Sequence, residues 1–140
     1  MDLELAQQVL GQQPFSRLLG ARVTAFGDGE ATLELDIREE LLQQYGFVHG
    51  GVLSYAADNT LTLAAGTVVG AGLITSGFTI DYLRPAKGAV LRAHGRVVRA
   101  GRTRVVTRCD VTTVGADGAR TLCAVAQGNI AVIEPAVGKD

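Results

Sequence analysis

The stretch from Gln43 to Val69 constrains the fold of this 140-residue chain more than any other segment. It begins with a glycine-rich loop and continues into a predicted helix, residues 51–68, in which nearly every position is apolar or small. That composition predicts burial on most sides, so we expect a sheet to wrap around the helix. The triplet Asp58-Asn59-Thr60 interrupts it, although Asp and Asn are poor helix-interior residues. A carboxylate in an apolar helix costs free energy unless it is paired, neutralised or facing a cavity, which makes the triplet a candidate functional site.

The segments that flank this helix have the pattern of antiparallel strands. Residues 30–37 alternate apolar and polar side chains, and Gly27-Asp28-Gly29 before them is a hairpin signal that joins them to a strand over residues 21–27. Helical spacing predicts short covering helices within residues 2–19. After the central helix come four more strand candidates and no further helix: residues 73–83, 89–100, 103–114 and 120–133. The order predicts one α+β domain over residues 1–140, with a mainly antiparallel sheet of about six strands.

Charge and composition exclude several classes of function. The net charge of −1 argues against nucleic-acid binding by the chain as a whole, and no apolar run reaches the roughly 18 residues of a membrane span. The N-terminus carries acids where a secretion signal would carry Lys or Arg. Cys109 and Cys123 form neither a disulfide framework nor a metal pattern, so we interpret them as reduced packing residues of a cytoplasmic protein. No His or Cys pair has metal-ligand spacing, and no GxxxxGK phosphate loop is present.

Basic residues gather in one part of the chain. From Arg84 to Arg108 there are eight of them and no Asp or Glu. Such a run indicates either an anionic partner or a solvated strand face whose arginine stems cover apolar surface. Composition alone leaves both interpretations open.

His49-Gly50-Gly51 stands where the loop becomes the helix. Glycines at a helix N-terminus let backbone N–H groups approach a ligand closely, and the positive end of the helix dipole favours negative charge there. Together these features make a candidate oxyanion site. The alternative is a glycine-rich turn that merely admits the chain into a crowded core. His49 is a candidate base or donor, whereas His94, in the middle of a strand, is interpreted as structural.

Asp58 lies eight residues after Gly50. At the rise of an α-helix the two residues are roughly 12 Å apart along the axis. A group that polarises a carbonyl and a base or nucleophile must both lie about 3 Å from the reacting atoms. One chain therefore cannot supply both to one site, and if both act, the site lies between two symmetric copies. Ser54, Asp58 and Thr62 share one helix face, which is alternatively a polar stripe that sees water.

Residues 46–53, GFVHGGVL, followed by Asp58 and then by residues 82–86, YLRPA, carry a resemblance to a known family. In this combination they resemble the hotdog-fold acyl-CoA thioesterases of the phenylacetate-pathway (PaaI) branch, which includes the mammalian thioesterase superfamily member 2 type. The order of elements is similar from about Pro14 to Ile133. The resemblance implies a hotdog fold, in which a sheet wraps the central helix.

The resemblance also implies roles for individual residues. Gly50 matches the position whose backbone N–H polarises the thioester carbonyl, and Asp58 of the facing subunit matches the carboxylate that attacks the thioester or activates water. His49 matches a histidine that shapes the site. Thr75 matches a Ser/Thr that holds the water or the carboxylate, with Ser76 as the alternative if the register slips by one residue. Gln43 stands where the family often has Asn to orient substrate or water.

The remaining implications concern the substrate and the assembly. The expected substrate is an acyl-CoA, with Gly51 and Phe47 among the residues that bind it and with Arg84, Lys87 and Arg102 on the phosphates of coenzyme A. No metal or tightly bound cofactor is expected. A homodimer is needed for the site, and the family commonly pairs dimers into tetramers.

Three other interpretations remain. Hotdog hydratases and dehydratases are similar in fold, but commonly have Pro-Gly before the helix where this chain has Val48-His49. A non-catalytic acyl-CoA-binding or regulatory module would use Asp58 only as a solvated helix residue. A structural interaction domain would not bind coenzyme A.

Overall fold

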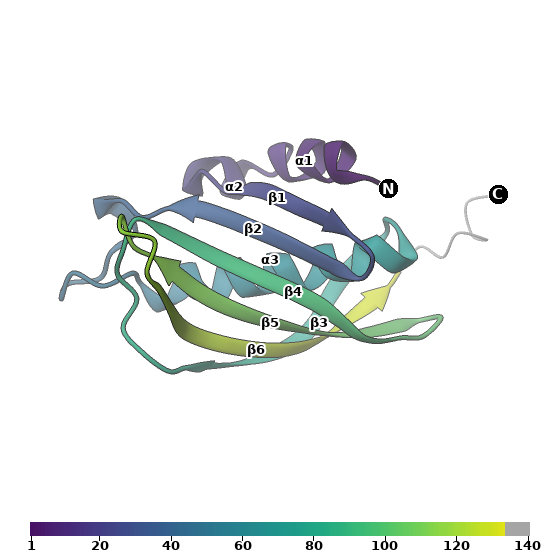
Figure 1. The fold of residues 1–140 in the computed structure, drawn as a ribbon. Helices are drawn as coiled ribbons and strands as arrows, with labels where there is room; N and C mark the ends of the chain where they lie inside the picture. The colour runs from purple at the N-terminus through teal and green to yellow at the C-terminus, as the bar shows by residue number, and fades with distance from the viewer. Residues whose placement is uncertain (134–140) are drawn as a thin grey trace.

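A curved sheet wraps one long helix in the computed structural model, which describes residues 1–133 (Figure 1). The helix α3 lies on one face of the sheet, and the two N-terminal helices lie beside β1 at one margin. The elements in chain order are α1 (Leu3–Gly11), α2 (Pro14–Leu19), β1 (Arg22–Gly27), β2 (Glu30–Asp36), α3 (Gly50–Val69), β3 (Leu73–Tyr82), β4 (Val90–Ala100), β5 (Arg104–Val114) and β6 (Arg120–Val132). A single 3₁₀ turn, Glu39–Leu41, lies in the loop before α3.

The six strands pair antiparallel in the order β1-β2-β4-β5-β6-β3. Although β3 follows α3 directly in the chain, it crosses to the far edge of the sheet and pairs with β6. The strands β1 and β3 are therefore the two edges. This arrangement confirms the predicted α+β hotdog fold, and each expected bound of the strands and of the central helix lies within one residue of the observed one.

Strand alternation separates a face that packs on α3 from a face that is open. In β5 the side chains of Val105, Thr107, Cys109 and Val111 are buried, whereas Arg108 and Asp110 between them are exposed. Cys109 and Cys123 are both buried and free, in agreement with the interpretation of packing thiols. The open face has no helix over it in the described part of the chain, which is why its side chains are mostly charged or polar.

Small residues let α3 sit deep in the sheet. Ala56, Ala57, Ala64 and Ala65 are almost fully buried, and the helix contacts all six strands. A Cβ atom on Gly95 of β4 would lie only 3.0 Å from the backbone oxygen of Thr60. The helix can approach β4 this closely because Gly95 has no side chain.

The two ends of α3 follow local rules. His49 is the N-cap residue, and its Nδ1 accepts a hydrogen bond from the N–H of Gly51 at 2.8 Å. The helix ends at Gly70, whose φ of 81° lies in the region that favours glycine. Asp58 and Asn59 lie in the middle of the helix, on the side that the sheet does not cover completely.

The N-terminal helices cover part of that remaining side. Asp2 caps α1 by accepting from the N–H of Leu5, Pro14 is the first residue of α2, and Gly20 ends α2 in a left-handed conformation. Ser16 of α2 is only 1% exposed. Its burial against α3 brings α2 next to the polar triplet, which local sequence patterns did not indicate.

Candidate active site

Asp58 lines an open cavity of about 260 Å³ between α3, β3 and Gln13, the residue that precedes α2. The hydroxyl of Thr75 donates to Oδ1 of Asp58 at 2.6 Å, and the hydroxyl of Thr62 lies 2.9 Å from that of Thr75. Because Thr75 uses its hydrogen on the carboxylate, Thr62 acts as the donor to Thr75. One carboxylate oxygen is thereby fixed by a charge-assisted bond, and the carboxylate is oriented toward the cavity.

The irregular register of β3 distinguishes Thr75 from Ser76. The pairing with β6 shifts between Thr75 and Gly77, so Ser76 is an extra residue on the strand. Thr75 is half-buried and bonded to Asp58, whereas Ser76 is exposed and lines no part of this cavity. Of the two residues expected from the sequence, the structure brings Thr75 to the carboxylate.

A polar wall beside Asp58 is formed by Gln13, which caps α2, and by Tyr55 and Asn59 of α3. Asn59 donates to Oε1 of Gln13 at 3.1 Å, Ser16 donates to the same oxygen at 2.6 Å, and the hydroxyl of Tyr55 donates to Ser16 at 2.6 Å. Burial raises the pKa of Tyr55 against the opposing effect of its hydrogen bonds to Ser16 and Asn59, so the phenol keeps its proton.

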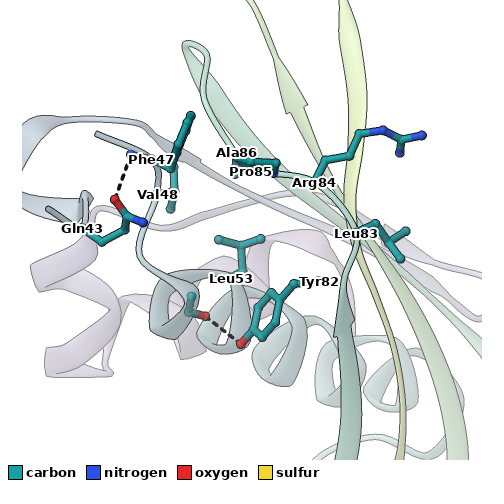
Figure 2. A pocket seen from close by; sticks show the side chains of 10 residues that line it. Gln43, Phe47, Val48, Leu53, Tyr82, Leu83, Arg84, Pro85 and Ala86 are labelled. Carbon is teal, nitrogen blue, oxygen red and sulfur yellow. Dashed lines mark hydrogen bonds between the residues drawn. The ribbon is translucent and has the colours of Figure 1, made fainter. Parts of the chain in front are cut away.

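A second cavity, of about 330 Å³, lies at the start of α3 (Figure 2). Phe47, Val48 and Leu53 give it an apolar lining, and Gly50 and Tyr82 also line it. The hydroxyl of Tyr82 donates to the carbonyl oxygen of Gly50 at 3.1 Å. The first turn of α3 is thus tied to the last residue of β3.

Only one of the two glycine N–H groups at the start of α3 is free. The N–H of Gly51 is taken by the ring of His49, and a Cβ atom on Gly51 would lie 3.0 Å from that ring nitrogen. For the N–H of Gly50, the described residues supply no acceptor. Gly51 therefore makes room for the cap, and Gly50 presents the free donor.

His49 and Gln43 support the loop that leads into the helix. His49 is exposed, and its Nδ1 accepts a hydrogen bond, so the neutral ring carries its proton on Nε2. Oε1 of Gln43 accepts from the N–H groups of Tyr45 and Phe47, as Figure 2 shows for Phe47. Gln43 therefore uses its oxygen to hold the loop, and its amide nitrogen is left for the cavity that it lines.

The basic residues expected at a phosphate site occupy different places. Arg84 follows β3 and lines the Gly50 cavity, but its guanidinium extends away from Leu53 and Tyr82 (Figure 2) and donates to the carbonyl of Leu122 at 2.9 Å. Lys87 is exposed in the same loop. The N–H of Val48 donates to the carbonyl of Ala86 in this loop. Arg102 lies in the turn between β4 and β5, at the opposite end of the sheet from Gly50. Within the basic run, Arg92 pairs with Glu34 at 2.6 Å.

Gly50 and Asp58 do not meet within one chain. The two cavities have no lining residue in common. This agrees with the separation expected from the helical rise. A single chain thus carries a free N–H donor in one cavity and an oriented carboxylate in another.

The part of the chain that the structure describes holds no group of three His, Cys, Asp or Glu side chains arranged to bind a metal ion. Within residues 1–133, no helix combines the length and the hydrophobicity of a membrane span.

Comparisons with known proteins place this arrangement in a family. The thioesterase superfamily model matches residues 45–129. Human acyl-coenzyme A thioesterase 13 is 30% identical over 78% of this chain and 80% of its own length. The crystal structure of a thioesterase family protein from Silicibacter pomeroyi has a TM-score of 0.85 at 26% identity and covers 90% of this chain and 93% of that one. The zebra fish thioesterase superfamily member 2 is similar in fold, with a TM-score of 0.80 at 24% identity, over 94% of this chain and 99% of its own.

The chain belongs to the thioesterase superfamily. Its class is accordingly that of a hydrolase of the thioesterase type, built on the hotdog fold.

The sequence did not single out several residues that line these cavities. Asn59 and Thr62 had a visible signal, since one belongs to the polar triplet and the other to the polar stripe on α3. Gln13 had none, and Tyr82 was noted only as part of the YLRPA segment of the family resemblance. They reach the site only because α2 packs on α3 and because β3 ends beside the start of α3.

Proposed function

We propose that this protein hydrolyses an acyl-CoA thioester at a site shared by two copies of the chain. The N–H of Gly50 in one chain polarises the thioester carbonyl, and the partner's Asp58 is the nucleophile or the general base. The site residues and the acyl-CoA substrate are those implied by the resemblance to the PaaI branch, and the cellular setting is the cytoplasm.

The observation that carries the proposal is the position of the two half-sites on β3. Thr75, near the start of this strand, is bonded to Asp58, and Tyr82, its last residue, is bonded to Gly50. The strand is also an edge of the sheet, with no partner on its outer side among the described residues. An edge strand presents unpaired N–H and C=O groups that favour pairing with another strand.

Antiparallel pairing of two β3 strands about a twofold axis aligns the start of each with the end of the other. The Asp58–Thr75 half-site of one chain then faces the Gly50–Tyr82 half-site of its partner, twice per dimer. Ile74 and Tyr82, which are 55% and 54% exposed in the single chain, provide apolar surface for this contact. The other edge, β1, packs against α1 and is less available. Pairing of dimers into a tetramer is a further expectation from the family.

The chemistry follows from the groups that meet. The Gly50 N–H and the positive end of the α3 dipole stabilise the negative charge that develops on the carbonyl oxygen. The partner's Asp58, held by Thr75, either attacks the carbonyl carbon to form an anhydride that water then opens, or removes a proton from the attacking water. In both routes the carbon–sulfur bond breaks, the thiolate leaves as coenzyme A, and water supplies the oxygen of the free acid.

The other expected residues have supporting roles in this proposal. His49 keeps the Gly51 N–H occupied and so fixes the turn, and the free amide nitrogen of Gln43 orients the substrate or water. Phe47 lines the passage to the carbonyl. Lys87 and Arg84 lie near the Gly50 cavity for the phosphates of coenzyme A, and Arg102 contributes through the partner chain. The reaction uses only protein groups and water, with neither a metal nor a bound cofactor.

A thiol-release assay tests the proposal. Wild type, Asp58→Asn and the control Asp81→Asn are given phenylacetyl-, hydroxybenzoyl-, short-chain and long-chain acyl-CoAs. Asp81 lies on the same strand as Thr75, but is exposed and lines a different hollow on the open face of the sheet, so its substitution matches the loss of charge without touching the site. We expect release by wild type and Asp81→Asn only, with coenzyme A binding retained by all three.

The outcomes separate the alternatives. Normal turnover by Asp58→Asn contradicts the mechanism. Binding of acyl-CoA by wild type with no thiol release from any substrate favours the non-catalytic module, and hydration of an enoyl-CoA favours the hydratase. No binding of coenzyme A at all favours a structural interaction domain.

A further inference from the structure

The polar wall beside Asp58 has one amide donor group and one amide acceptor that no group within residues 1–133 uses. Oε1 of Gln13 accepts from both Ser16 and Asn59, so the two amides are joined through this oxygen. Within residues 1–133, neither Nε2 of Gln13 nor Oδ1 of Asn59 has a hydrogen-bond partner, and both residues line the Asp58 cavity. The NH₂ of Gln13 and the carbonyl of Asn59 are thus groups of this cavity that a ligand can bond.

The rest of the network explains why this orientation of the Gln13 amide is stable. Ser16 is almost completely buried, accepts from Tyr55 and donates to Gln13, so its hydroxyl hydrogen is committed. The Tyr55 ring is held in turn by edge-on packing against Phe15, with ring centres 5.4 Å apart. Reversal of the Gln13 amide would set its NH₂ against two donors, which costs free energy.

We infer that Gln13 and Asn59 select an acyl group that carries a hydroxyl a few atoms from the thioester. This rests on the function proposed above, and it adds a substrate class and two specificity residues to the same site. A hydroxyl both donates and accepts, so one such group satisfies Oδ1 of Asn59 and Nε2 of Gln13 together. The hydroxyl lies close to the reacting carbonyl because Asn59 directly follows Asp58 and both face one cavity.

The physical basis of selection is the cost of leaving these groups without a partner. Gln13 and Asn59 are both half-buried residues, so without a ligand their amide groups can bind water. An acyl chain expels that water against Leu73, Ile74 and the Tyr55 ring, which line the same cavity. A plain chain then leaves a donor and an acceptor unpaired, whereas a hydroxylated chain replaces the lost bonds. Two neutral hydrogen bonds of this kind correspond to about a tenfold to hundredfold preference.

The test compares two substrates that differ only in the hydroxyl. Thiol release is measured for butyryl-CoA and 3-hydroxybutyryl-CoA with wild type, Gln13→Leu, Asn59→Leu and the control Gln12→Leu, which removes an exposed amide one residue away. We expect wild type and Gln12→Leu to prefer the hydroxylated substrate in kcat/KM by about tenfold or more. Gln13→Leu and Asn59→Leu should each lose most of that preference. Their kcat/KM for butyryl-CoA should change by a smaller factor than the ratio of kcat/KM between the two substrates.

A purely structural role predicts a different result. If the network only attaches α2 to α3, the variants lower the thermal stability and the kcat/KM of both substrates equally, and an unchanged ratio overturns the inference. A wild type that does not distinguish the two substrates overturns it as well.

Binding separates failure of this inference from failure of the proposed function. Dissociation constants are measured for the two ketone analogues in which a CH₂ group between carbonyl and sulfur prevents hydrolysis. If wild type hydrolyses nothing but binds the hydroxylated analogue at least tenfold more tightly, and Asn59→Leu does not, the selection stands and the hydrolytic function fails. Equal binding of the two analogues by wild type overturns the selection, whatever the activity.

Discussion

Replacement of Gly50 by proline removes the one free N–H group at the start of α3 and leaves the rest of the helix in place. Gly50 is the first helical residue, the position at which proline is best tolerated, and no helical turn precedes it to clash with the ring. The preceding residue, His49, has φ −58° and ψ 136°, which is the extended conformation that a following proline requires. A Cβ atom on Gly50 would lie 3.5 Å from the Tyr82 ring, an ordinary contact.

The expected loss follows from the role of the N–H group. Removal of one donor to a developing oxyanion lowers kcat by about 10²–10³, or roughly 3–4 kcal/mol of transition-state stabilisation. Gly50→Ala is the matched control, because it adds the same Cβ atom and keeps the N–H. We expect Gly50→Ala to retain most of the activity and Gly50→Pro to lose it, with closely similar melting temperatures and coenzyme A binding.

The assay is steady-state thiol release with the best substrate of the panel, together with thermal unfolding of each variant. If Gly50→Pro is folded and works at the rate of Gly50→Ala, the backbone donor has no part in the reaction. The interpretation of the α3 N-terminus as an oxyanion site would then be refuted.

Two further predictions test the shared site and the core. When the inactive variants Gly50→Pro and Asp58→Asn are mixed and exchange chains, half of the dimers contain one chain of each variant, and each of these mixed dimers holds one intact site. Thiol release should therefore return to about a quarter of the wild-type rate. If mass spectrometry shows that the chains have exchanged and the activity does not recover, one chain holds the whole site. Burial, and to a lesser extent the nearby Asp110 charge, raises the pKa of Cys109 from its ordinary value of 9.0 to about 12. The unfolded chain therefore releases this proton first, so the free energy of unfolding is unaffected by the thiol below pH 9 and falls as the pH rises from 9 toward 12. Between pH 7 and pH 10, the free energy of unfolding measured with urea should fall more in wild type than in Cys109→Ala. Equal decreases in the two proteins would contradict the raised pKa of Cys109.

Local patterns in the sequence determined the elements of the fold. The apolar content of α3, the alternation along β2 and the Gly27-Asp28-Gly29 turn each depend on neighbours within a few residues, and each was predictable for that reason. The rise of an α-helix is a constant, so the separation of Gly50 from Asp58 followed from their numbering alone. The same constant showed that two chains are needed if Gly50 and Asp58 both act at one site.

The tertiary structure alone decided which distant residues meet. No local pattern records that β3 crosses to the edge beside β6, because strand order depends on pairing between residues far apart in the chain. The bulge at Ser76, which gives Thr75 and not its neighbour to Asp58, arises in that pairing. In the same way Tyr82 reaches Gly50, and Gln13 reaches Asn59, through the packing of separate elements. Periodicity tells which face of an element is buried, but only the contact between two faces decides which side chains share a cavity.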